Sequence, residues 1–148
     1  MLQTMNIQTA FSLIAGFLTI ISCSSSKVGN TEIVSIKHGT SFGMCEGYCF
    51  NEVEYNKEYK IETKKNWTTS DVKVQKSNMN STDWQQLLAI IDLKKVMSLN
   101  EIYGCPDCAD QGQEWIEIKT KNTTKRITLE FRSSEVHELN KILKILRK

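Results

Sequence analysis

The 148-residue chain carries 19 lysines and arginines against 17 aspartates and glutamates, which gives a formal net charge of +2. All of these charges follow residue 22, and they are too evenly mixed to indicate a nucleic-acid partner. Residues 23–148 have the commonest length of a single domain. We therefore expect one domain and no nucleic-acid binding.

An uncharged apolar run opens the chain over residues 10–21, AFSLIAGFLTII. It matches the core of a signal peptide and is well short of the roughly 20 residues that span a bilayer, although no Lys or Arg precedes it. The following Ile20-Ile21-Ser22-Cys23 resembles the lipobox of bacterial lipoproteins. This pattern predicts a signal peptide over 1–22, lipid such as palmitate on Cys23, a flexible tether over 23–30 and a domain over 31–148. The protein is then expected in the cell envelope, anchored to a membrane through its lipid and facing the periplasm or the surface.

Alternating strand patterns come first in the predicted domain. They cover residues 31–37, 50–55, 58–64 and 71–76, with a tight hairpin turn at Asn56 and Lys57 between the second and third. The period changes at Thr82, where Trp84, Leu87, Leu88 and Ile91 take helical spacing. This spacing predicts a helix over 82–92.

Two further strands are predicted over 114–120 and 125–131, with Ile127, Leu129 and Phe131 facing the core. A final helix is expected from about Ser134, with one apolar stripe made by Val136, Leu139, Ile142, Leu143 and Leu146. The order of these elements predicts an α+β domain. We expect an antiparallel sheet of about five to six strands with two helices packed on one side.

Four cysteines fall inside the predicted domain, at Cys45, Cys49, Cys105 and Cys108. An even number in an exported chain favours two disulfides. A bridge between the two clusters would contribute about 4 kcal/mol on a chain-entropy argument, against about 2 kcal/mol for a local ring. That difference favours long-range bridges, but the sequence leaves all three pairings open.

Two other uses of these cysteines compete with disulfides. The same four thiolates could bind zinc, because Cys-Pro-Asp-Cys has the spacing of a zinc knuckle, and His38, Asp107 or Asp110 could substitute as ligands. The simpler interpretation makes each of the last three a plain loop residue. Thiol–disulfide exchange is the third possibility, but the acidic residues around Cys105 and Cys108 would raise a thiol pKa.

Conventional catalysis finds little support in the sequence. The chain has two histidines, His38 and His137, and the second is expected on the surface of the final helix. No nucleophile, base and orienting acid can be nominated together. We therefore expect no enzymatic activity and no cofactor, and a structural or binding domain whose partner is an envelope protein or an extracellular ligand.

The stretch Ser41 to Tyr48, SFGMCEGY, resembles the opening motif C-F-G-x-C-P-x-Y of an uncharacterised family of small lipoproteins from Bacteroidota. Phe42, Gly43, Cys45 and Tyr48 match that motif, whereas Ser41 and Glu46 stand where the family has cysteine and proline. GCPDCAD and the following EWIEI look like a feature of a subgroup, so that the resemblance covers residues 31–64 and 101–131. It implies a lipoprotein domain without an assigned activity. The family's bridge between its two motif cysteines could not form here.

Overall fold

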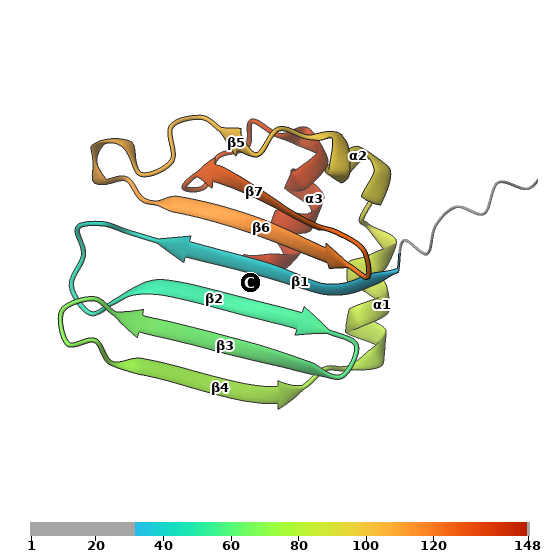
Figure 1. Cartoon of the computed structure of the whole chain (residues 1–148), viewed down its shortest axis with the longest axis horizontal. Helices are drawn as coiled ribbons and strands as arrows, with labels where there is room; N and C mark the ends of the chain where they lie inside the picture. The colour runs from blue at the N-terminus through green and yellow to red at the C-terminus, as the bar shows by residue number, and fades with distance from the viewer. Residues whose placement is uncertain (1–31, 148) are drawn as a thin grey trace, which may run out of the picture.

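A computed structural model describes residues 32–147 of the chain. In this part, seven strands form one mixed sheet, and three α-helices cover one of its faces (Figure 1). The strands are β1 (Ile33–Ser41), β2 (Tyr48–Asn56), β3 (Tyr59–Asn66), β4 (Val72–Asn78), β5 (Ile102–Tyr103), β6 (Gln113–Thr120) and β7 (Thr124–Glu130), in the spatial order β4-β3-β2-β1-β6-β7-β5. The α+β class is confirmed.

The core lies between the helices and the β1–β6–β7 half of the sheet. Alternate residues of a strand point to opposite faces, so Ile116 and Ile118 of β6 face the helices while Trp115 and Glu117 face away. The other side of the core comes from the helices and from Val136, which precedes α3, and it includes Trp84 and all five residues of the predicted C-terminal stripe. We call the face without helices the open face.

The helices are α1 (Ser81–Ala89), α2 (Leu93–Ser98) and α3 (His137–Leu146). Asn80 caps α1, since its side chain accepts a hydrogen bond of 2.8 Å from the Thr82 N–H. Asp92 caps α2 in the same way through the Lys95 N–H, at 3.2 Å. Because Asp92 is extended and caps α2, the helical segment is interrupted here and α2 is separate from α1.

Several details differ from the prediction. The described residues contain seven strands in place of five to six, and three α-helices in place of two. The helix predicted over 82–92 is divided into α1 and α2, because α1 ends at Ala89 with Ile90 as its C-cap and Asp92 takes an extended conformation. The sheet is mixed and not wholly antiparallel, since β5 runs parallel to β7. A two-residue strand has no periodicity from which it could be predicted.

The two ends of the sheet carry different connections (Figure 1). At one end lie the β1–β2 loop (42–47), the β3–β4 turn (67–71), the β5–β6 loop (104–112) and the segment after β7 (131–136). We call this the disulfide end. The opposite end holds Glu32, the β2–β3 and β6–β7 turns and α1, and we call it the tether end.

The predicted signal peptide (1–22), Cys23 and the tether (23–30) lie outside the described residues. No helix within residues 32–147 is both long enough and apolar enough to cross a membrane.

Candidate functional site

The four domain cysteines pair locally. Cys45 and Cys49 stand at disulfide distance with their Cα atoms 5.8 Å apart, and Cys105 and Cys108 do so with Cα atoms 5.4 Å apart. Of the three pairings that the sequence left open, this is the local one and not a long-range one that the entropy argument favours. Each Cα separation already lies in the range that a disulfide requires, so the geometry of the two loops outweighs the larger loop-closure entropy of a long-range bridge.

The two cysteine loops lie next to each other at the disulfide end. A Cβ atom placed on Gly43 would be 3.4 Å from the Asp107 carboxylate, and one placed on Gly112 would be 2.2 Å from the Phe42 ring. Phe42 also packs edge-on against Phe131, with ring centroids 4.7 Å apart. The β1–β2 loop, the β5–β6 loop and the segment after β7 therefore form one continuous surface.

Backbone strain in the described residues is concentrated at this end. Within residues 32–147, eight residues have a left-handed backbone conformation, and all eight lie in the loops of the disulfide end. They are Gly47, Ser70, Gly104, Asp107, Ala109, Asp110, Gly112 and Arg132. The five that are not glycines pay roughly 1–3 kcal/mol each for that conformation. Strain of this kind persists where the surrounding structure enforces it, and it tends to gather at functional sites.

Large apolar side chains are exposed on the same surface. Met44, between the two glycines of its loop, is 75% exposed, and Trp67 in the β3–β4 turn is 51% exposed. Trp67 contacts Phe50, with ring centroids 6.1 Å apart, and the Lys65 ammonium lies 4.6 Å from the centroid of the Phe50 ring. Exposed Met and Trp side chains held on rigid loops are typical of binding surfaces.

Trp115 extends this aromatic row onto the open face. Its ring lies 5.4 Å from that of Phe50 and directly over Gly39, where an added Cβ would stand 2.1 Å from a ring carbon. The Arg126 guanidinium covers the ring at 4.4 Å from its centroid. Trp115 is therefore 1% exposed although no helix covers it, and its indole N–H has no hydrogen-bond partner among the described residues.

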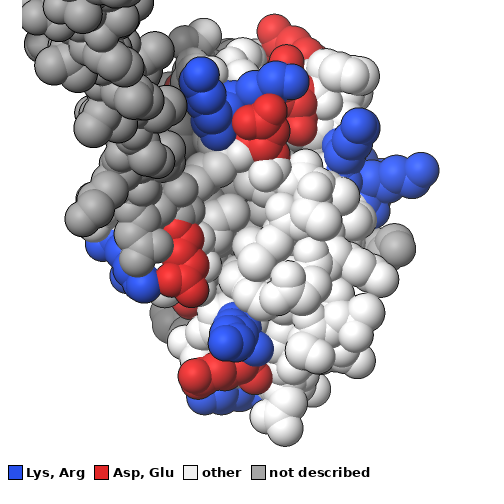
Figure 2. Space-filling model, turned by 90° about the vertical axis from the view of Figure 1, so that its right-hand side faces the viewer, with Lys and Arg blue, Asp and Glu red and all other residues white. Residues whose placement is uncertain are grey.

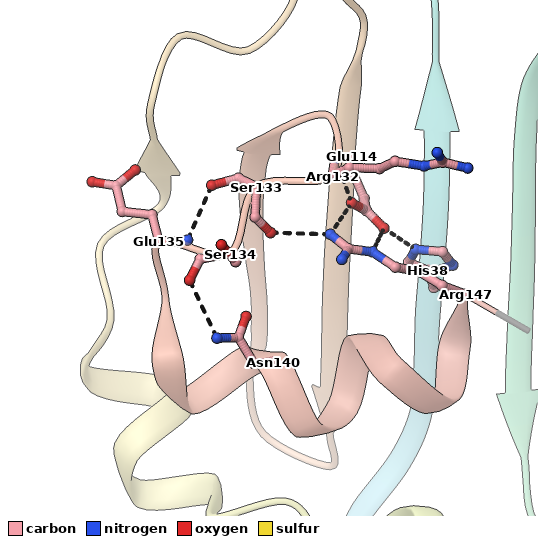
Figure 3. Close-up of polar contacts among 8 residues, drawn as sticks. All are labelled: His38, Glu114, Arg132, Ser133, Ser134, Glu135, Asn140 and Arg147. Atoms are coloured by element: carbon pink, nitrogen blue, oxygen red, sulfur yellow. Dashed lines mark hydrogen bonds and ion pairs between the residues drawn. The ribbon is translucent and has the colours of Figure 1, made fainter.

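A buried charge network lies beneath the disulfide end (Figure 3). Glu114, at the start of β6, is 1% exposed. Arg147, just after α3, donates to both of its carboxylate oxygens, from Nε at 2.9 Å and from Nη2 at 2.6 Å. The Arg132 backbone N–H donates at 3.2 Å, and His38 on β1 donates from Nε2 at 2.6 Å. Arg147 also donates to the Ser133 carbonyl at 3.1 Å.

The network keeps Glu114 ionised. Burial alone would raise the pKa of this carboxyl, but the hydrogen bonds from His38 and Arg147, together with the Arg147 charge, lower the pKa to about 2. Because the carboxylate can only accept hydrogen bonds, the Nε2 atom of His38 must carry a proton. Four segments that are distant in sequence are thereby held together: β1, β6, the segment after β7 and the end of α3.

His38 and Glu114 correct the sequence interpretation. The simpler interpretation of the sequence places His38 in a loop, but it lies in β1, paired with Val53 and Ile116, and it is buried. Asp107 lies in the β5–β6 loop, as expected, whereas Asp110 is the last residue of a short 3-10 helix within that loop. Glu114 was missed as a site residue, although it shares the inward face of β6 with Ile116. A carboxylate at an inward position of an apolar strand was the available signal.

The network does not have the form of a hydrolytic triad. In the described residues, no serine, threonine or cysteine side chain is hydrogen-bonded to His38, and the network includes no nucleophile. His137, the other histidine, is exposed at the start of α3, as predicted.

The positions of the four domain cysteines bear on the metal and redox hypotheses. Within residues 32–147, no three or more His, Cys, Asp or Glu side chains group as metal ligands do. Cys105 precedes a short 3-10 helix (Cys108–Asp110) and does not stand at the N-terminus of an α-helix, the position that acidifies a thiol. Cys105 and Cys108 are both exposed, as the redox hypothesis requires.

Comparisons with protein-family models and with curated proteins found no match to this chain. The resemblance to small Bacteroidota lipoproteins thus stays a prediction based on the motif residues around Phe42 and Cys45.

Proposed function

We propose that the protein is an exported lipoprotein, anchored through Cys23, whose domain is a non-enzymatic binding module. The disulfide end is its binding surface, and an envelope protein or an extracellular ligand is its partner. One observation carries the proposal: both disulfide pairs, all the left-handed residues of the described chain and the exposed Met44 and Trp67 meet at one end of the sheet.

The loops of the disulfide end are preorganised for binding. A loop that is already fixed loses little conformational entropy when a partner binds, so more of the contact energy appears as affinity. Two local disulfides, the contact of Phe42 with Phe131 and the charge network beneath all restrict the loops. Exposed Met and Trp side chains then provide apolar contact area.

The anchor is tested by metabolic labelling with a fatty-acid probe in cells. The wild-type chain should incorporate the probe and the Cys23→Ala variant should not, because the cysteine thiol is the proposed attachment point. Equal incorporation by both chains would reject the anchor.

The binding surface is tested by placing a photo-crosslinking amino acid at Met44 in the full chain, in cells. Asn122, exposed in the β6–β7 turn at the tether end, is the matched control position. A discrete protein adduct should form from Met44 and not from Asn122. Adducts from both positions, or from neither, would contradict a binding surface at the disulfide end.

Zinc binding, the alternative use of the four domain cysteines, is separated from disulfides by a count of free thiols and bound metal in the purified protein. Disulfides should leave almost no thiol titratable after unfolding without reductant, and the metal content should be far below one ion per chain. One zinc per chain with four titratable thiols would replace the binding-module proposal by a metal site, since one set of sulfurs cannot serve both purposes.

A further inference from the structure

Part of the end of the domain nearest the proposed anchor is free of charged side chains, although Lys57, Glu58 and Lys121 also lie at this end. Helix α1 covers this end, and Asp83 is the one charged residue within it. Its exposed side chains near its C-terminal end are uncharged: Gln85, Gln86 and Ala89. Figure 2 views this end and shows a broad area without charge, with the lysines, arginines and acidic residues gathered at its margin.

Apolar side chains contribute to the same surface. Val34 is 40% exposed, and Leu88, Ile90 and Ile91 are half-buried at the end of α1 and just beyond it. A hollow of about 520 Å³ opens beside them, and Ile33, Val34, Tyr59, Trp84 and Leu88 supply its apolar lining. Four charged residues also line this hollow, namely Glu32, Lys57, Glu58 and Lys121.

The length of chain between the proposed anchor and the domain limits which surface can reach the bilayer. Eight residues separate Cys23 from Glu32. Fully extended, this stretch spans at most about 30 Å. Strand β1 has nine residues and is therefore about 30 Å long, which is the distance from the tether end to the disulfide end. The disulfide end could therefore contact the membrane only if the tether ran back along nearly the whole domain.

We propose that the α1 surface of the tether end rests on the lipid bilayer, so that the disulfide end points away from the membrane. This inference rests on the proposed anchor at Cys23. Charges lose hydration when they approach the low-dielectric interior of a bilayer, whereas amide and aliphatic side chains lose much less. Because the anchor supplies a high local concentration, a weak lipid contact is enough to set the orientation.

The test uses tryptophan fluorescence in the full, lipidated chain reconstituted in phosphatidylcholine vesicles with brominated acyl chains, which quench nearby tryptophans. Gln85→Trp adds a reporter on α1. Met44→Trp adds a matched exposed reporter at the disulfide end. Each reporter's quenching is obtained by subtracting the fluorescence of the parent chain, which keeps its own tryptophans. Lipid quenching of the Gln85→Trp signal should exceed that of the Met44→Trp signal at least twofold.

Two further arms test the cause of the orientation. Adding Gln86→Glu and Ala89→Glu to Gln85→Trp should reduce its lipid quenching to the level of Met44→Trp, while the protein still floats with the vesicles. Raising the salt concentration should change nothing, because the proposed contact is uncharged. Equal quenching of the two reporters, stronger quenching of Met44→Trp, or quenching that requires anionic lipid would overturn the proposal.

Failure of the anchor is recognised separately. If the wild-type chain and Cys23→Ala both fail to float with vesicles, the anchor is rejected. The orientation is then measured on chains coupled through the Cys23 thiol to a maleimide lipid in the same vesicles, with the same expected and opposing results.

Discussion

Replacing Glu114 by Gln removes the negative charge at the centre of the buried network with almost no change of shape. The shift of the Glu114 pKa from 4.5 to about 2 corresponds to about 3 kcal/mol of stabilisation when the carboxyl is ionised. Removal of one partner from a buried ion pair costs about 3–5 kcal/mol in other proteins. Glu114→Gln should therefore lower the free energy of unfolding at pH 7 by about 3 kcal/mol.

The same substitution should change how stability depends on pH. Because folding lowers the pKa of Glu114, its contribution is complete above about pH 4.5 and is lost as the pH falls towards 2. The wild-type domain should lose stability across this window relative to the variant. The difference of about 3 kcal/mol at pH 7 should thus shrink towards zero near pH 2.

Urea unfolding monitored by circular dichroism at several pH values measures both effects. Glu62→Gln is the matched control: Glu62 pairs with Lys60 at 2.6 Å, but its side chain is 36% exposed. Loss of that pair should cost under about 1 kcal/mol. The reasoning fails if Glu114→Gln costs no more than Glu62→Gln, or if its cost is the same at pH 3 as at pH 7.

Three other substitutions or treatments address packing and the disulfides by the same assay. Trp84→Ala should cost about 3–5 kcal/mol, because this buried side chain anchors α1 to the core; a loss below 1 kcal/mol would contradict that. Gly39→Ala should cost about 1–3 kcal/mol by displacing the Trp115 ring, whereas Gly43→Ala, with its nearest neighbour at 3.4 Å, should cost clearly less; equal costs would contradict the ring contact. Reduction of the disulfides should cost about 2 kcal/mol for each local ring, and an unchanged midpoint would argue against both pairs.

The sequence was most informative where a periodic pattern is long. All five apolar positions of the predicted C-terminal stripe are buried, from Val136 to Leu146, and six of the strands lie close to their predicted ranges. Helix α3 begins at His137 and not near Ser134, because residues 131–136 form the segment whose backbone carries hydrogen bonds to Glu114 and Arg147.

The candidate site was only partly predictable. Composition and spacing identified the cysteines, but pairing depends on the distance between Cα atoms, which spacing does not determine. The partners of Glu114 come from three other segments of the chain, so no local pattern connects His38 or Arg147 to it. The clustering of left-handed residues at one end likewise depends on topology, because the loops that carry them are far apart in sequence.

The position of the core along the chain has a consequence for how the domain folds. Among the fully buried side chains of the core cluster in the described residues, Ile36 alone comes from β1 to β4, and all the others follow residue 83. The central strand β1 gains its second neighbour only when β6, late in the chain, pairs with it. The four-stranded N-terminal meander therefore has too little apolar surface to bury by itself, and cooperative folding must await α3. If the N-terminal half emerged first from a ribosome or a translocon, it would have no stable fold, which would suit the export that we propose for this protein.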